Sequence, residues 1–325
     1  MSSPKVSVAM ATFNGERFLE AQLDTLYAQT WPNLEVVVSD DASTDGTAAI
    51  LERYARSHGL RLDAHRERLG LVGNFERALS MATGELVALS DQDDLWKPQK
   101  IERLVAALGE PEAGKTLAYC NPAETLEEDG RIHVERAHDP VIAFLRAHGS
   151  GRPAHRLLAE PWVVSHTLMV RRSVLAVALP FPAGLRYHDA WLALSACSEG
   201  EIVYVDELLQ TYRRHQSSLT FRSEAPKRRR LAAFVSGTAA AQWRALAEEQ
   251  SQVLTAAAAL PGWSAAERRQ LERLRTYYRA GLEPGWRWRS TLAGCRVAGW
   301  FHTSQSWTRR LLVPLRPLLG GRGRH

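Results

Sequence analysis

Short apolar runs alternate with amphipathic segments along the first two-thirds of the chain. The runs Val6–Thr12, Leu34–Ser39 and Glu85–Ser90 are almost continuously apolar, as expected of strands that are buried on both faces. Between the first two, Arg17–Gln29 carries apolar residues at helical spacing, and a second helical pattern ends at His58. Weaker signals of both kinds precede the third run. This alternation predicts an α/β fold with a mainly parallel sheet flanked by helices.

Each of the three apolar runs is followed by a polar cluster. The clusters read TFNGE from Thr12, DDASTDGT from Asp40 and DQDD from Asp91. Because parallel strands end at the same edge of a sheet, and ligands bind beyond that edge, the three clusters should meet there. The pattern therefore predicts a binding site at the carboxyl edge of the sheet.

The third cluster holds three carboxylates, Asp91, Asp93 and Asp94. Two carboxylates separated by one residue can bind Mg²⁺ or Mn²⁺ and leave coordination positions open for phosphate oxygens. The structural alternative is a solvated acidic turn, or a cap of the helix expected near Pro98. One cap needs only one aspartate, so the surplus negative charge favours a cation.

The second cluster begins with Asp40 and Asp41, directly at a strand end. A carboxylate there can accept a hydrogen bond from the imide N–H of uracil or thymine. Ser43, Thr44 and Asp45 are good helix N-caps, so part of this motif has a structural role. The spacing alone leaves both interpretations of Asp41 open.

The composition is that of an ordinary globular protein. Of 325 residues, 45% are hydrophobic and 24% charged. The three cysteines, Cys120, Cys197 and Cys295, are far apart and indicate a reducing compartment. The start of the chain lacks the apolar core of a signal peptide, and no run reaches the roughly 18 apolar residues of a spanning helix. We therefore expect a cytoplasmic protein.

Charge divides the chain into two parts. Residues 1–224 contain 23 Lys+Arg and 31 Asp+Glu, whereas residues 225–325 contain 18 and 5, together with six of the ten tryptophans. The second part has Ala-rich helical patterns and ends in a segment rich in Trp, Leu and Arg. This composition suits peripheral contact with an anionic membrane at its inner face, and the alternative is a helical packing domain with a basic outer face. Nucleic acid is disfavoured because the acidic part would repel it.

Four ordered segments carry a family resemblance: VSVAMATFNGERFLEAQLDTLYAQT, VVVSDDASTDGT, GLVGNFERAL and GELVALSDQDDLWKPQKI. Together they resemble family 2 glycosyltransferases, which have the GT-A fold, and are most similar to rhamnosyltransferase-like bacterial members. The resemblance runs through most of residues 5–222. It implies an inverting enzyme that transfers a sugar from a nucleoside diphosphate to an acceptor hydroxyl in surface polysaccharide synthesis.

The resemblance also implies roles for individual residues. On the donor side, Thr12, Phe13 and Asn14 would line the nucleotide pocket, Asp41 would bind the base with support from Asp40, and Gly70 and Asn74 would shape the adjoining loop. At the diphosphate, Asp93 would bind the metal, Asp91 would lie near the ribose or the metal, and Asp94 would reach a sugar hydroxyl or the metal's surroundings.

The acceptor side is represented by RYHDAWLALSACS, which resembles the family's base motif. Asp189 would be the general base, whereas without the resemblance it reads as a helix N-cap. His188 would tune Asp189 or bond the sugar, and the alternative for it is a satisfied surface histidine. Near residue 213, YRRH resembles the end of the family domain, where His215 would complete the metal site or simply lie in a solvated basic strand end. His166 stands where a smaller residue is common, which changes the expected pocket shape.

Two rival functions are less well supported by the sequence. A non-enzymatic cation- or nucleotide-binding module would need neither a base nor this order of motifs. A nucleotidyl or phosphoryl transferase would usually carry a Gly-rich phosphate loop, and no GxxxxGK[ST] is present. The family resemblance implies as partners a dTDP-rhamnose or UDP-hexose donor and a glycan or lipid-linked glycan acceptor.

Overall fold

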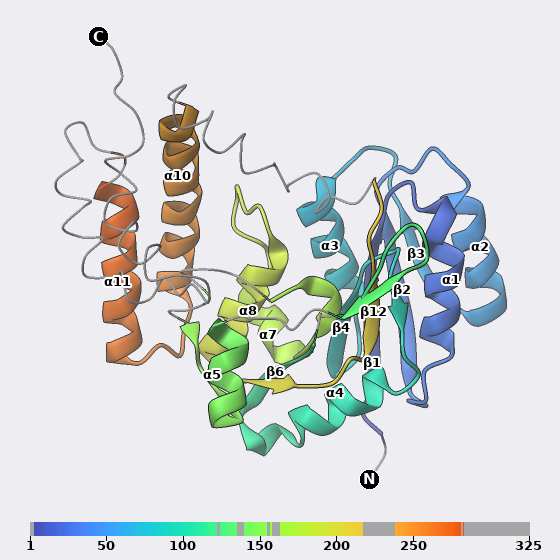
Figure 1. Cartoon of the computed structure of the whole chain (residues 1–325), viewed down its shortest axis with the longest axis horizontal. Helices are drawn as coiled ribbons and strands as arrows, with labels where there is room; N and C mark the ends of the chain where they lie inside the picture. Colours follow the sequence, from blue (N-terminus) through green and yellow to red (C-terminus); the bar gives the residue numbers. More distant parts are fainter. Residues whose placement is uncertain are drawn as a thin grey trace.

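Two β-sheets organise the chain (Figure 1). The computed structural model describes residues 3–121, 124–134, 140–154, 157, 163–216, 238–280 and 282. The larger sheet has the strand order β3-β2-β1-β4-β10-β6-β11-β9. Its strands are β1 (Val6–Thr12), β2 (Leu34–Asp40), β3 (Arg61–Ala64), β4 (Leu86–Ser90), β6 (Lys115–Cys120), β9 (Ser150–Gly151), β10 (Leu168–Arg171) and β11 (Glu201–Val205).

The larger sheet is mainly parallel, as the sequence predicts. Strands β3, β2, β1 and β4 run in one direction, and β11 runs parallel to β6. Only β10 and β9 run against their neighbours in this sheet. The carboxyl ends of β1, β2 and β4 therefore share one edge, which is where the three polar clusters begin.

Helices cover both faces because the strands present apolar side chains on both. In β1, Val6, Val8 and Met10 belong to one hydrophobic cluster, while Ala9 and Ala11 belong to the other. The first cluster contains buried residues of α1 (Glu16–Tyr27), α2 (Thr47–His58) and α4 (Lys100–Leu108). The second contains those of α3 (Gly70–Met81), α5 (Pro140–His148), α7 (Arg172–Ala178) and α8 (His188–Glu199). Two 3₁₀ turns, η1 (Pro111–Ala113) and η2 (Ser165–Thr167), complete this part.

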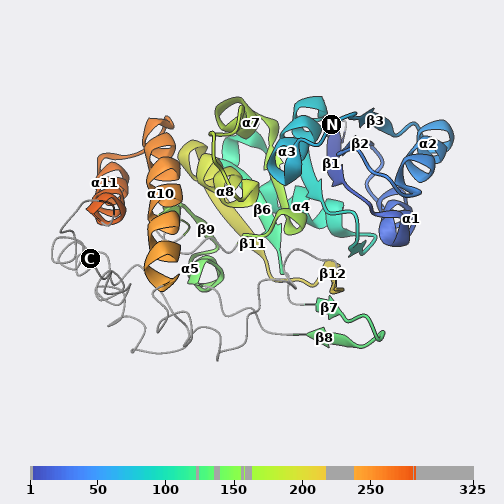
Figure 2. The ribbon, with the colours of Figure 1, turned by 90° about the horizontal axis from the view of Figure 1, so that it is seen from above.

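The smaller sheet adjoins the acidic cluster. It has the order β5-β12-β7-β8 and lies apart from the larger sheet in Figure 2. Its strands are β5 (Leu95–Trp96), β7 (Glu124–Leu126), β8 (Ile132–Val134) and β12 (Gln210–Arg213). Because β5 directly follows Asp94 and pairs with β12, the end of β12 is brought to the acidic cluster.

The described part of the C-terminal region forms helices, as expected, and these pack on the sheet domain. Helices α10 (Thr238–Ala259) and α11 (Ala265–Ala280) lie side by side. Their buried side chains, including Leu254 and Leu274, belong to the same hydrophobic cluster as α8. At the turn between them Gly262 has φ 73°, and a Cβ there would lie 1.9 Å from the Ser198 carbonyl oxygen, so only glycine allows this approach.

The start of α11 is closed by a capping box. The Ser264 N–H donates to Glu267 Oε2 at 2.8 Å, and the Glu267 N–H donates to Ser264 Oγ at 3.2 Å. No helix in the described ranges is both long and apolar enough to cross a membrane. The expected boundary at residues 224 and 225, and the Trp-rich segment after residue 282, lie outside the described residues.

Candidate active site

The three polar clusters meet at the carboxyl edge, which confirms the expected convergence. Thr12 at the end of β1 donates its hydroxyl to Asp40 Oδ1 at 2.7 Å. The Gln92 side chain forms two bonds with the backbone of Phe13, accepting from its N–H at 2.9 Å and donating to its carbonyl at 3.0 Å. The loop after β1 is thus joined to both neighbouring strand ends.

Asp41 anchors the start of α3. Its carboxylate is 1% exposed and accepts hydrogen bonds from the backbone N–H groups of Leu69 (2.5 Å) and Gly70 (3.1 Å). Arg68 Nε lies 3.3 Å from the same carboxylate, and the Arg68 guanidinium stacks 3.5 Å from the centre of the Phe13 ring. Asp41, Arg68 and Phe13 therefore form one contiguous group beside the β1 and β2 ends.

Two asparagines fix the backbone around this group. Asn14 has φ 47°, and its side-chain oxygen accepts from the Thr44 N–H at 2.8 Å. Asn74 on α3 is buried and donates to the Thr12 carbonyl at 3.0 Å, while its own Oδ1 has no protein partner. The nucleotide-side residues expected from the sequence, Thr12, Phe13, Asn14, Asp40, Asp41 and Asn74, all belong to this interlinked edge.

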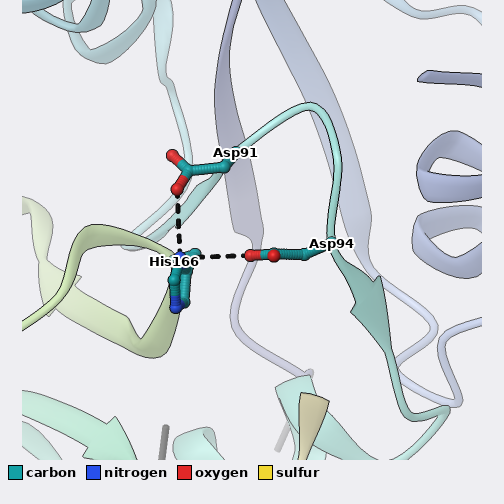
Figure 3. Close-up of side chains that lie close together, drawn as sticks. All are labelled: Asp91, Asp94 and His166. Atoms are coloured by element: carbon teal, nitrogen blue, oxygen red, sulfur yellow. Dashed lines mark hydrogen bonds and ion pairs between the residues drawn. The ribbon is translucent and has the colours of Figure 1, made fainter. Parts of the chain in front are cut away.

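The acidic cluster is organised around a histidine, His166 in η2 (Figure 3). Its Nδ1 lies 3.0 Å from Asp91 Oδ2 and 3.1 Å from Asp94 Oδ2. The hydrogen bond goes to Asp91 Oδ2, and within the described residues the buried Asp94 Oδ2 has the ion-pair contact with His166 but no hydrogen bond. Among the residues that the structure describes, these three form the group whose ligand atoms are close enough for a metal ion.

Burial and mutual charge set the protonation of this group. Burial raises the pKa of Asp94 to about 7, and the negative charges of Asp91 and Asp93 add to this effect. Burial alone would also raise the pKa of Asp91. The hydrogen bond from His166 and its positive charge outweigh burial, and they hold the Asp91 pKa below its usual value. Conversely, burial opposes charging of His166, yet Asp94 and Asp91 together raise its pKa.

Asp93 has a different histidine partner. His215, just beyond β12, places Nε2 2.9 Å from Asp93 Oδ2, and the Arg213 guanidinium donates to the Asp93 carbonyl at 2.9 Å. A cavity of about 110 Å³ adjoins this pair, lined by Arg17, Phe18, Leu126, Glu127, Glu128, Gly130, Arg213, Arg214 and His215. The expected metal residues Asp91, Asp93 and His215 are therefore divided between two acid–histidine pairs.

A buried lysine contacts the two elements that lead to the histidines, η2 and β12. Lys100 at the start of α4 is 0% exposed, and its ammonium donates to the His166 carbonyl and to Gln210 Oε1, both at 2.5 Å. It also lies 3.5 Å from the centre of the Trp96 ring. Burial lowers the Lys100 pKa to about 8. None of the three aspartates caps α4, whose N-cap is Gln99 without a side-chain cap bond, so the capping interpretation is wrong for this helix.

The expected base adjoins the acidic cluster from the other side. Asp189 lies in the first turn of α8, and the N-cap position belongs to Tyr187. The Asp189 carboxylate accepts from the Ala190 N–H at 2.7 Å and from the backbone of Ser165 in η2. Burial, reinforced by the charge of Asp91, raises its pKa to about 6.

His188 is buried beside the base, and the described part of the chain offers its ring nitrogens no hydrogen bond. Its ring stacks on Phe75 with 3.9 Å between centroids, and neither ring nitrogen has a hydrogen bond. Burial lowers its pKa to about 4, so the imidazole is neutral near pH 7. A neutral imidazole offers one donor and one acceptor, which are the groups that a sugar hydroxyl can satisfy.

Sequence reasoning missed three members of this site. His166 was noted only for its size, although its imidazole joins Asp91 to Asp94. Lys100 and Gln92 were given no role. For Gln92 the available signal was its position directly after Asp91 of the acidic motif. For Lys100 it was a lysine at an otherwise buried position of a helix.

Comparison with known proteins now decides the family. Residues 7–176, more than half of the chain, match the sequence profile of Glycosyl transferase family 2. The chain belongs to this glycosyltransferase family. Among its relatives are two Bacillus subtilis proteins with provisional glycosyltransferase names, EpsE and the teichuronic acid biosynthesis protein TuaG. EpsE is 38% identical over 109 residues, which cover 33% of this chain and 39% of EpsE. TuaG is 36% identical over 104 residues, which cover 31% of this chain and 40% of TuaG. The matches thus span less than half of either relative.

Solved structures confirm that the family 2 chain has the GT-A fold. S. aureus TarS (residues 1–349, with UDP-GlcNAc) superposes with TM-score 0.63 at 16% identity, covering 97% of this chain and 88% of that one. The mannosyltransferase PcManGT from Pyrobaculum calidifontis, with GDP-Man and Mn²⁺, gives TM-score 0.56 at 21% identity, covering 98% and 81%. At these identities the likeness concerns the fold, while a rhamnosyltransferase-like subtype remains a prediction.

Proposed function

We propose that this family 2 protein is an inverting glycosyltransferase, with Asp189 as general base and the Asp91–Asp94 cluster as the diphosphate site. The supporting observation is the position of η2, which contacts both groups. His166 bonds Asp91 while the Ser165 backbone bonds Asp189. Two carboxylates whose pKa values are shifted in opposite directions are thus held beside each other by one short turn.

The proposed reaction follows from the two environments. Asp189 takes the proton from the acceptor hydroxyl as its oxygen attacks the anomeric carbon, and the bond from that carbon to the phosphate oxygen breaks on the opposite face. A base with a pKa of about 6 is ionised at neutral pH and still basic enough to assist. The neutral imidazole of His188 orients a sugar hydroxyl through its unpartnered nitrogens.

The residues present fit a divalent cation. Carboxylate oxygens and imidazole nitrogens suit Mn²⁺ and Mg²⁺, and the buried Asp94 Oδ2, which has no hydrogen bond within the described residues, is a ligand atom beside His166. Asp91, Asp94 and His166, or Asp93 with His215, would hold the ion. Such an ion would stabilise the charge on the nucleoside diphosphate leaving group. Arg213 and Arg214, which line the adjoining cavity, supply further positive charge there.

The donor proposed is dTDP-rhamnose or a UDP-hexose, and the acceptor is a glycan or lipid-linked glycan of a bacterial surface polysaccharide. Phe13 and Asp41 lie side by side at the nucleotide edge, with Arg68 bridging them. Their place at the ends of β1 and β2 supports recognition of a pyrimidine base there, with Arg68 moving off the Phe13 ring and the Asp41 carboxylate when the base binds. The TuaG name, which refers to teichuronic acid, supports the polysaccharide class.

Isothermal titration with dTDP, UDP and GDP, each with Mn²⁺ and with EDTA, tests the donor site. We expect one pyrimidine nucleotide to bind with metal and to bind at least about ten-fold more weakly in EDTA. Asp93→Ala should remove the metal dependence, whereas Asp63→Ala, on β3 and outside the site, should not. Failure of all three nucleotides to bind under either condition would reject the donor site and favour a different cation-binding role.

A further inference from the structure

Helix α11 presents a row of arginines to solvent. Its buried side chains, Leu271, Leu274, Tyr277 and Tyr278, lie on one side and face the hydrophobic cluster. On the other side, Arg268, Arg269, Arg273 and Arg279 are exposed, and none of the four has an ion pair in the described part of the chain. The fold gains no salt bridge from these four charges, so their stabilising role is small.

The same side of α11 borders a hollow. A cavity of about 330 Å³ lies between α10 and α11, lined by Ala258, Arg268, Arg269, Leu271, Glu272 and Arg275. Glu272 is its only lining carboxylate among the described residues and is paired with Arg275 at 2.9 Å. The Arg275 Nε is buried and has no hydrogen-bond partner. Three guanidinium groups against one carboxylate leave a hollow suited to a phosphate group.

The sequence that follows extends this character. Residues 283–325 contain eight arginines, four tryptophans and a single carboxylate. Arginine with tryptophan and little acid is typical of segments at the headgroup level of an anionic bilayer. Among the described helices α11 is also the outermost, at the end of the molecule away from α1 and α2 (Figures 1 and 2).

We propose that the arginine face of α11 docks on an anionic membrane surface and that the Arg268–Arg269–Arg275 cavity receives a lipid phosphate headgroup. The proposal places the membrane contact that the composition predicts on one described helix, α11. It depends on the proposed function only for the reason to bind a membrane, which is to bring the enzyme to a lipid-linked acceptor. Vesicle binding itself needs no catalysis.

Co-sedimentation of the full chain with vesicles tests the proposal. Phosphatidylcholine vesicles are compared with vesicles containing about one-third phosphatidylglycerol, at low and high salt. We expect binding to the anionic vesicles only, weakened by salt. The combined change of Arg268, Arg269, Arg273 and Arg279 to Gln should weaken this binding at least about ten-fold.

A matched variant removes the same charge from the sheet domain, away from α11. Arg53, Arg56, Arg66 and Arg77 are exposed residues in or beside α2 and α3, and their combined change to Gln should leave vesicle binding within about two-fold. Equal binding by the α11 variant and wild type, or equal binding to neutral vesicles, would overturn the proposal. Binding of the α11 variant to duplex DNA is measured alongside. If this variant lost DNA binding but kept vesicle binding, the proposal would also be overturned. Nucleotide titration of the α11 variant should be unchanged, which separates this result from a failure of the donor site.

Discussion

The protonation of single residues at this site is set by burial. Asp189 and Asp94 are both carboxylates, but burial and neighbouring negative charge raise their pKa values to about 6 and about 7. Asp91, bonded to His166, has its pKa lowered. One cluster of acids thus contains groups that differ in charge at the same pH, which is the condition for assigning separate roles to base and cation ligand.

The first prediction concerns the pH dependence of transfer. Asp189 must be ionised to accept a proton, and with a pKa of about 6 it is protonated at lower pH. We therefore expect kcat/KM for transfer to fall about ten-fold per pH unit below about pH 6. Asp189→Asn should lose about 10²- to 10⁴-fold in kcat while nucleotide affinity is retained. Undiminished turnover by this variant would remove Asp189 as the base.

The second prediction separates stability from activity at His188. Its buried ring nitrogens have no partner, which costs about 1–3 kcal/mol in the folded state. His188→Phe should keep the stack on Phe75 and leave the free energy of unfolding equal or higher, while kcat/KM falls about ten-fold through loss of a sugar contact. Thermal unfolding and initial rates measure the two effects. His148→Phe is the control, since that exposed imidazole also stacks on a phenylalanine.

At the scale of elements, the site is built where two sheets meet. Strand β4 delivers Asp91, β5 follows Asp94, and β12 ends beside His215. Lys100 contacts both η2 and β12 through its two hydrogen bonds. Because η2 carries His166 and β12 leads to His215, one buried ammonium links the two elements from which the histidines of both pairs come.

The third prediction tests this coupling. Lys100→Met keeps the length of the side chain but leaves the His166 carbonyl and Gln210 Oε1 without their donor. We expect metal-dependent nucleotide affinity to fall about ten-fold or more, together with a lower melting temperature. Leu104→Ala, a buried change in the same helix, should cost about 2–5 kcal/mol of stability but leave affinity unchanged. Equal affinity losses in the two variants would make the Lys100 effect a general loss of stability.

The sequence predicted the elements better than their contacts. Apolar periodicity located β1, β2 and β4, and the rule that parallel strands end together placed the three polar clusters at one edge. The His166–Asp91 and Lys100–Gln210 bonds join residues 75 and 110 positions apart. No local pattern encodes such pairs. The burial that shifts the pKa of Asp189 likewise depends on the packing of α8 and η2.

For the whole molecule, packing joins the two compositional halves. The opposite net charges of residues 1–224 and 225–325 suggest two bodies, and that division remains a prediction. Yet Trp263 and Leu274 are buried in the same hydrophobic cluster as Trp191 of α8. The charge difference concerns exposed side chains and does not divide the core. Whether the two parts unfold together depends on the hydrophobic cluster that they share.

The fourth prediction follows from that core. Trp263 is 5% exposed and donates its indole N–H to the Ala257 carbonyl at 2.7 Å. Trp263→Ala should therefore cost about 3–5 kcal/mol of unfolding free energy. Because α10, α11 and α8 share the cluster, loss of this side chain should lower the single unfolding transition of the whole chain rather than release the helices alone. Far-ultraviolet circular dichroism and nucleotide-binding capacity, followed together during heating, should fall with the same midpoint. If nucleotide binding persisted after the helical signal of α10 and α11 had been lost, the two halves would be independently stable, and the shared cluster would not couple the helices to the site.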